Sequence, residues 1–242
     1  MGLFSFLFGK KKKAEEAKAA SAKYGIEITA LWAGWTGPAA WNFTEGPETL
    51  GIVPVAYRAV RVQNLLDGAA YARKLGVKDV VTHMGFIPED PNDPLFPGFC
   101  AAVRVVAKHL EENGQYLLFE TGQETPVTLL RAIEDIGTDN LGINLDPANL
   151  LMYGKANPID GLDVFGKYVI EVHAKDGAYP TEGRNLGKEY PLGQGKVNFP
   201  AFLEKLKEKA YEDFLLEMEN EETDMIDEAA LNMITHSNNS KR

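Results

Sequence analysis

The chain has 242 residues, 45% of them hydrophobic, and a formal net charge of −10 at pH 7. This length and composition predict one large domain with a substantial core, and the acidic balance argues against nucleic acid as a partner. The single cysteine, Cys100, excludes an internal disulfide, and no apolar run reaches the roughly 20 residues that a membrane-spanning helix needs. We therefore expect a cytoplasmic protein.

The N-terminal residues 1–13, MGLFSFLFGKKKK, differ from the rest of the chain in composition. Their charge follows the apolar residues, so the segment does not have the pattern of a secretory signal. It is either a solvated tail, the commoner case, or a weak peripheral contact with an anionic membrane. A predicted helix of strong helix formers, KAEEAKAASAKY, follows and ends at Gly25. Residues 1–24 are therefore predicted to precede a main domain of residues 25–242.

Six predicted strands then alternate with helices along the chain. The strands take residues 26–32, 79–83, 116–120, 142–146, 168–175 and 214–219. The helices take residues 57–75, 98–112 and 126–136, a short stretch after 146, residues 198–209, and a closing segment. Such alternation predicts parallel strands joined by right-handed crossovers, in either an open doubly wound sheet or a (β/α) barrel.

The polarity of the strands favours the barrel. Strands covered by helices on both faces are apolar throughout, whereas these strands become polar on one face toward their ends. In strand 168–175, a period of two places Glu171, His173 and Lys175 on one face, and Ile170 with its apolar alternates on the other. Asp146 ends the preceding strand in the same way. The mouth of a barrel collects such residues from several strand ends.

Four polar residues end four successive strands and are predicted to converge: Glu120, Asp146, His173 and Glu217. Three carboxylates and an imidazole at one mouth would repel one another strongly, and a divalent cation removes this repulsion. Oxygen donors with one nitrogen favour Mn²⁺ or Mg²⁺, with Co²⁺ as a substitute and Zn²⁺ less favoured. Any one of these residues alone is more often a solvated group, a helix cap or a core residue. The shared position at the strand ends favours metal binding.

Several segments resemble the sugar phosphate isomerase/epimerase family of xylose isomerase-like TIM barrels. They are THMGFIPEDP, FETGQETP, NLDPANLLMYG, EVHAKDG, EYPLGQGKVNF and FLLEMEN, and the resemblance runs from about residue 24 to the C-terminal segment. It implies a TIM barrel, one divalent metal ion held by the four strand-end residues, and a carbohydrate substrate. It also implies that Glu120 and Glu217 exchange a proton with the carbon beside a carbonyl, through an enediolate, in an isomerase or epimerase.

The resemblance also implies an incomplete barrel. The four metal residues of the family lie on strands five to eight, so the segment 26–32 is its third strand and the first two have no counterpart. We therefore expect an open six-stranded sheet with unpaired edges at residues 26–32 and 214–219. It is either covered by self-association, as a homo-oligomer, or left with low stability and weak activity. A truncated gene model is the remaining explanation.

Six further residues are predicted to contact the sugar: Trp35, Trp41, His83, Asn149, Lys175 and Arg184. The two tryptophans belong to the loop 33–47 and either stack on a sugar or form a packed lid. Lys175 either meets a substrate oxygen or pairs with Asp176, Glu171 or Glu219.

Two of these predictions bear on the choice of substrate. Asn149 stands where the epimerases of the family often carry a histidine. Arg184 lies in the glycine-containing loop 177–196, which in barrels is a common place for phosphate. The alternative to an enzyme is an inactive barrel remnant that binds a sugar, a protein partner or a membrane surface.

Overall fold

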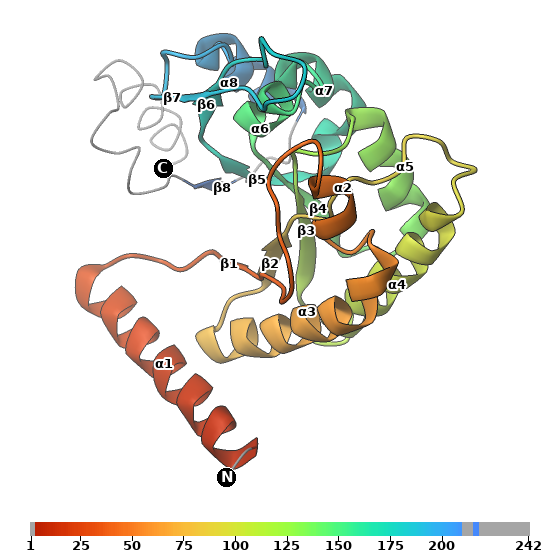
Figure 1. Cartoon of the computed structure of the whole chain (residues 1–242). Helices are drawn as coiled ribbons and strands as arrows, with labels where there is room; N and C mark the ends of the chain where they lie inside the picture. The colour runs from red at the N-terminus through yellow and green to blue at the C-terminus, as the bar shows by residue number, and fades with distance from the viewer. Residues whose placement is uncertain (1–2, 210–214, 218–242) are drawn as a thin grey trace.

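Six parallel strands form one sheet in the order β1-β2-β3-β4-β5-β8 (Figure 1). The computed structural model describes residues 3–209 and 215–217, with backbone alone for 3–12 and 215–217. The strands are β1 (Ala30–Trp32), β2 (Asp79–Thr82), β3 (Tyr116–Glu120), β4 (Leu141–Leu145), β5 (Val169–His173) and β8 (Leu215–Glu217). This confirms the predicted incomplete α/β barrel, with β1 and β8 at the two ends of the described sheet. Association with a second copy along these edges stays a prediction.

Most of the helices form a single layer against one face of the sheet. They are α1 (Leu3–Tyr24), α2 (Gly46–Thr49), α3 (Val55–Leu75), α4 (Leu95–Glu111), α5 (Pro126–Ile136), α6 (Pro147–Met152), α7 (Pro158–Phe165) and α8 (Phe199–Lys209), with a 3-10 turn at Gly166–Tyr168. Contacts run from α3 to α4, α4 to α5, α5 to α7 and α7 to α8, so successive crossover helices lie side by side. Helix α1 contacts α3 and extends away from the body of the molecule (Figure 1).

Local signals set most of these boundaries. Helix α3 ends where Gly76 adopts a left-handed conformation, with φ of 84°, and Thr125 caps α5 by accepting a hydrogen bond from the Thr128 amide. Strand β1 is shorter than the predicted 26–32, because its partner β2 begins at Asp79, opposite Ala30. Helix α1 begins ten residues before the predicted start at Lys13, since leucine and lysine are themselves good helix formers.

Four other elements were not predicted from the sequence. They are helices α2 and α7 and the ribbon of β6 (Asp176–Gly177) with β7 (Glu189–Tyr190), and each is short and lies within a stretch that reads as a loop. The predicted closing helix lies outside the described residues.

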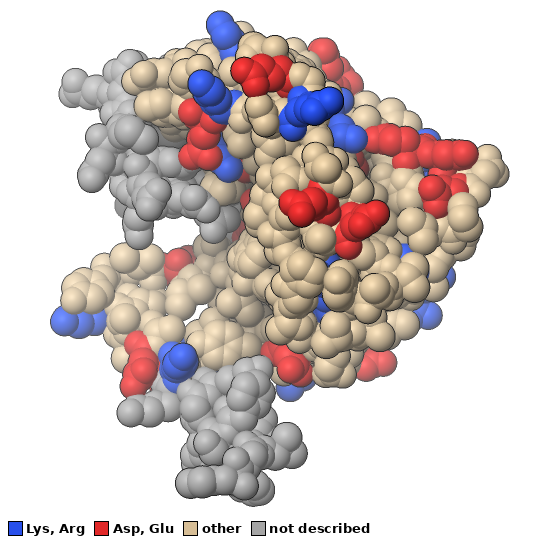
Figure 2. All heavy atoms as spheres, in the orientation of Figure 1, with Lys and Arg blue, Asp and Glu red and all other residues tan. Residues whose placement is uncertain are grey.

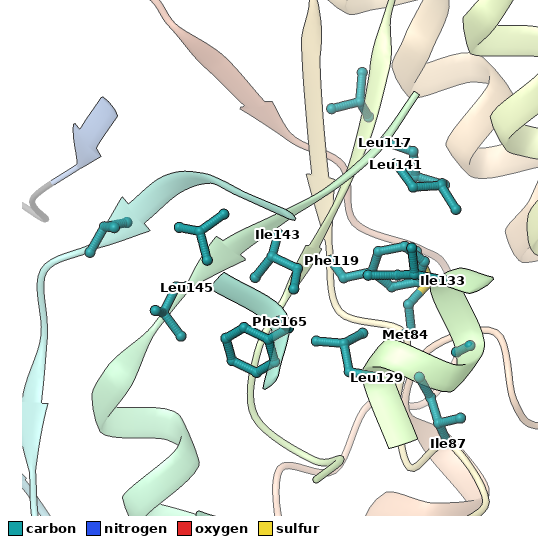
Figure 3. Close-up of a cluster of buried hydrophobic side chains, with 14 of the residues drawn as sticks. Met84, Ile87, Leu117, Phe119, Leu129, Ile133, Leu141, Ile143, Leu145 and Phe165 are labelled. Carbon is teal, nitrogen blue, oxygen red and sulfur yellow. The ribbon is translucent and has the colours of Figure 1, made fainter. Parts of the chain in front are cut away.

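The main core lies between the sheet and the helical layer. Figure 3 shows Phe119, Ile143 and Leu145 of the strands facing Leu129 of α5 and Phe165 of α7. All five side chains are buried, and burying one side chain of this size contributes about 1.5–3 kcal/mol. This packing fixes the outer faces of β3 and β4, so their polar alternate residues must face the inside of the partial barrel.

A β-bulge in β5 corrects one predicted face. The register pairs Ile143 with Val169 but Asn144 with Glu171, so β5 carries one extra residue, Ile170. Ile170 was predicted on the helix-facing side, yet it lies against Gly142 on the inner face, where an added Cβ would overlap its Cδ1 atom. Without the extra residue, His173 would point to the helices. The bulge therefore re-aims His173 toward the carboxylates of β3 and β4.

We expect Gly51→Ala to destabilise the protein far more than Gly114→Ala. Both glycines have positive φ angles, 69° and 66°, so alanine strains both backbones by about 1–2 kcal/mol. Only at Gly51 would the new methyl overlap backbone, at the carbonyl of Met84, whereas nothing lies within 4 Å at Gly114. The expected loss for Gly51→Ala is about 3 kcal/mol or more in urea unfolding. Equal losses of stability in the two variants would contradict the close approach of Gly51 to the Met84 carbonyl.

Candidate active site at the carboxyl ends of the strands

A cavity of about 350 Å³ opens at the carboxyl ends of the strands. Its lining residues are Trp32, Trp41, His83, Glu120, Asn144, Asn149, Met152, Tyr153, His173, Lys175 and Leu186. This is the end of a (β/α) barrel at which active sites lie, and the volume is at the lower end for small-molecule sites. A second cavity, of about 880 Å³, lies at the opposite ends of the strands, near Asp79, Tyr116 and Leu141.

Three buried side chains converge beside the first cavity and can hold a metal ion. His173 Nδ1 lies 3.2 Å from Glu120 Oε1 and 3.4 Å from Asp146 Oδ2. Ligand atoms of the three residues all lie within 4.8 Å of one another. Asp146 Oδ2 is buried and accepts no hydrogen bond from the described residues. Two carboxylate oxygens and one imidazole nitrogen therefore fit a hard or borderline divalent cation.

Asp146 is held by the end of β3 and by the helix that follows it. Its amide donates to Thr121 Oγ1 at 2.9 Å, and Thr121 Oγ1 donates back to the Asp146 carbonyl at 2.8 Å. Oδ1 caps α6 by accepting from the Asn149 amide at 2.7 Å, which turns Oδ2 toward His173. Burial raises the pKa of Asp146 to about 6, although Lys175 and His173 favour its charged form.

Glu120 ends β3 with both carboxylate oxygens engaged. Oε2 accepts from Trp32 Nε1 at 2.6 Å and lies 3.3 Å from His83 Nε2, while Oε1 faces His173. Burial alone would raise the pKa of Glu120, but His83, His173 and the Trp32 N–H together lower it to about 2. Burial lowers the pKa of His83, while the neighbouring Glu120 carboxylate opposes this shift. Glu120 is therefore ionised at neutral pH.

Glu217, the fourth predicted ligand, is the last residue of β8. Its backbone pairs in register with His173, so the sheet brings the two residues to neighbouring positions. Its side chain lies outside the part of the chain that the structure describes, and its role as a ligand and proton carrier stays a prediction.

The loop 33–47 forms an aromatic wall over the cavity. Trp41 lines the cavity and meets His83 edge to face, with ring centres 5.0 Å apart. Trp35 is not among the lining residues and packs between Trp32 and Trp41, at 5.9 and 6.3 Å. Trp41 thus faces the cavity and Trp35 packs behind it, and contact of either ring with a sugar stays a prediction. The wall rests on Arg61, a fully buried side chain 5.4 Å from the Trp35 ring.

Lys175 and Asn149 also line the cavity. Lys175 Nζ lies 3.2 Å from Glu189 Oε2 and 3.7 Å from Asp146 Oδ2, and it donates to Asn149 Oδ1 at 3.4 Å. These ion-pair partners are not the carboxylates considered from the sequence, because the β6–β7 ribbon brings Glu189 back to the strand end. Lys175 thus forms ion pairs and faces the cavity at once.

The structure does not bring Arg184 to the cavity. Arg184 is exposed on the loop 177–196 and is not among the lining residues. The glycines of this loop surround Asp176, whose carboxylate accepts from the amides of Gly193 at 3.0 Å, Gly195 at 3.0 Å and Val197 at 3.1 Å. Because these three amides already donate to Asp176, they are not free to bind an external anion such as phosphate.

Sequence reasoning missed Trp32, which both lines the cavity and binds Glu120. The signal was present, because Trp32 ends strand 26–32 as Glu120 ends strand 116–120. Tyr153, Met152 and Leu186, which lie beyond the strand ends, were missed as well, and their spacing gives no comparable signal.

The surface agrees with the acidic composition. On the face shown in Figure 2, lysine and arginine side chains are interspersed with acidic ones and form no continuous basic patch. Among the described residues, no helix has both the length and the apolar character needed to span a bilayer. The lack of a nucleic-acid partner, the membrane contact of residues 1–13 and the cytoplasmic location stay predictions.

Comparison with known proteins identifies the family. Residues 3–235 match the sequence profile described as xylose isomerase-like TIM barrel. A xylose isomerase domain protein from Planctomyces limnophilus is 33% identical, with 93% of this chain and 82% of that chain covered and a TM-score of 0.85. A D-tagatose 3-epimerase-like protein shares the fold at 22% identity, with coverages of 93% and 85% and a TM-score of 0.69.

One curated relative resembles the chain over part of the relative's length. An uncharacterized protein from Methanocaldococcus jannaschii is 29% identical over 175 residues, covering 67% of this chain. The chain spans 57% of the length of that relative. The family profile nevertheless covers nearly all of the present sequence, including every strand of the sheet. The chain therefore belongs to the xylose isomerase-like TIM barrel family, as the sequence resemblance predicted.

Proposed function

We propose that the protein is a divalent-metal-dependent isomerase or epimerase of a sugar, which moves a proton at a carbon beside a carbonyl. The observation that carries the proposal is the convergence of Glu120, Asp146 and His173 beside a small cavity with an aromatic wall. Family membership supports it. Aromatic rings such as that of Trp41 suit the apolar faces of sugars, and the polar groups on the other side suit their hydroxyls.

The residues that would hold the cation are Glu120, Asp146, His173 and Glu217, with Mn²⁺ or Mg²⁺ as the best match to mostly oxygen donors. When bound, such an ion supplies positive charge that stabilises negative charge developing on the substrate oxygens. Without an ion, His83, His173 and the Trp32 N–H are the groups that favour the charged form of Glu120.

Proton transfer is assigned to Glu120 and Glu217. A carboxylate must be ionised to accept a proton, and the lowered pKa of Glu120 keeps it so at neutral pH. Transfer by one carboxylate on one face of the substrate gives an aldose–ketose isomerase. Transfer by two carboxylates on opposite faces gives an epimerase. His83 and Trp32 hold Glu120 in place during either reaction.

The cavity favours a sugar without a phosphate group. Lys175 is the one cationic side chain among the lining residues, and it already pairs with Asp146 and Glu189. The glycine amides of loop 177–196 are taken by Asp176. These contacts give phosphate no ready set of donors among the described residues.

Proton NMR of sugars incubated with the metal-loaded protein in D₂O tests this function. The panel consists of free aldoses and 2-ketoses, each with its phosphorylated counterpart. The sugar that is the substrate should gain deuterium at one carbon beside its carbonyl. An interconverted aldose and ketose identifies an isomerase, and a second ketose identifies an epimerase. If sugars bind but none exchanges a proton with any of Mn²⁺, Mg²⁺ or Co²⁺, the protein is a binding module instead.

A further inference from the structure

Trp32 makes a contact with Glu120 that packing alone does not explain. It is the last residue of β1 and pairs in register with Val81 of β2, which pairs with Leu118 of β3. The three residues share the inner face, and Glu120 lies two positions further along β3. The indole reaches across β2 to place Nε1 at 2.6 Å from Glu120 Oε2.

This contact gives the two carboxylate oxygens of Glu120 different partners. An indole N–H is a donor only, so the oxygen facing Trp32 must accept its hydrogen bond. His83 Nε2, at 3.3 Å, approaches the same oxygen. The other oxygen, Oε1, therefore faces His173 Nδ1, which in turn lies 3.4 Å from Asp146 Oδ2. Rotation of the carboxylate would break the hydrogen bond to the indole.

The surroundings of Trp32 show that its ring is not simply a core residue. Its exposed fraction is 47%, and it packs in a tilted arrangement on Trp35. A phenylalanine would supply the same apolar contact with Trp35. What only tryptophan supplies at this position is an N–H directed at a buried carboxylate.

We propose that Trp32 is the positioning residue of Glu120: its indole N–H fixes Oε2, so that Oε1 is presented with Asp146 and His173 to a divalent cation. The inference rests on the proposed function only through the metal site, and not through the identity of the sugar. Removing a residue that hydrogen-bonds to a metal ligand and orients it typically weakens metal affinity by about 10- to 100-fold.

The first arm of the test is the indole N–H spectrum of the ¹⁵N-labelled full chain. The chain has three tryptophans, so three indole signals are expected, and Trp32→Phe assigns one of them. The Trp32 signal should move in Glu120→Gln, because an amide oxygen is a weaker acceptor than a carboxylate. Trp35, whose Nε1–H donates to no partner among the described residues, is the internal control. A Trp32 signal that Glu120→Gln leaves in place overturns the proposal.

The second arm is the affinity for Mg²⁺ and Mn²⁺ by calorimetry. Trp32→Phe should weaken it by about tenfold or more. Trp41→Phe is the matched control, since Trp41 also lines the cavity but makes no contact with Glu120 in the described residues, and its metal affinity should be unchanged. Wild-type affinity in Trp32→Phe would overturn the proposal. Neither arm needs a sugar, so both hold even if the panel of sugars shows no reaction.

Discussion

Asp146→Asn should remove most of the affinity for divalent cations while leaving the fold intact. Oδ2 of Asp146 is buried and faces His173, so the substitution replaces a charged metal ligand by a neutral amide. Asparagine is as good an N-cap as aspartate, so the cap on α6 is retained. We expect the affinity for Mn²⁺ to fall by about 100-fold or more, measured by calorimetry on the metal-free protein. His173→Ala should give a similar loss.

Asn157→Ala is the matched control for this experiment. Asn157 caps α7 through its side chain, away from the cavity, so its loss should cost about 1 kcal/mol of stability. Metal affinity should stay at the wild-type value. If Asp146→Asn binds Mn²⁺ as tightly as the wild type, Asp146 is a helix cap and not a ligand.

Glu120→Gln should slow proton exchange at the substrate carbon by about 10²- to 10⁴-fold. Glutamine keeps the shape of the side chain and an oxygen for the Trp32 N–H, but it does not take up a proton. The rate is measured as deuterium incorporation at saturating metal, which separates weaker metal binding from lost proton transfer. Glu217→Gln should show a loss of the same order.

Asp163→Asn serves as the control carboxylate. Asp163 is an exposed residue of α7 that pairs with Lys205 on α8. The variant should therefore exchange the substrate proton at the wild-type rate. Exchange at the wild-type rate in Glu120→Gln would exclude Glu120 as a proton carrier and leave it, at most, a metal ligand.

Local signals in the sequence were sufficient for most of the fold. Strand 116–120 and helix 126–136 agree with β3 and α5 because Pro126 opens the helix and Gly137 ends it. The bulge at Ile170 was not predictable from a period of two, which assumes regular pairing. The face of a residue after a bulge depends on the neighbouring strand, and this information is not local.

The residues of the site that end the strands could be predicted from the sequence. Glu120, Asp146 and His173 were found together because parallel strands end at one edge of the sheet. The same rule applied to strand 26–32 would have included Trp32. The bonding of Asp176 to the amides of its own loop depends on the path of that loop, which is not a local property. Arg184 was predicted in the site because such loops commonly bind phosphate in barrels, and it is exposed and not among the lining residues.

Deuterium incorporation with and without metal tests the central claim most directly. The wild-type protein is stripped of metal with a chelator, assayed in D₂O with the reactive sugar, and assayed again after addition of Mn²⁺ or Mg²⁺. A metal site formed by Glu120, Asp146 and His173 predicts no exchange in the stripped protein and recovery when the ion is restored. Equal exchange in the stripped and the restored protein would contradict it.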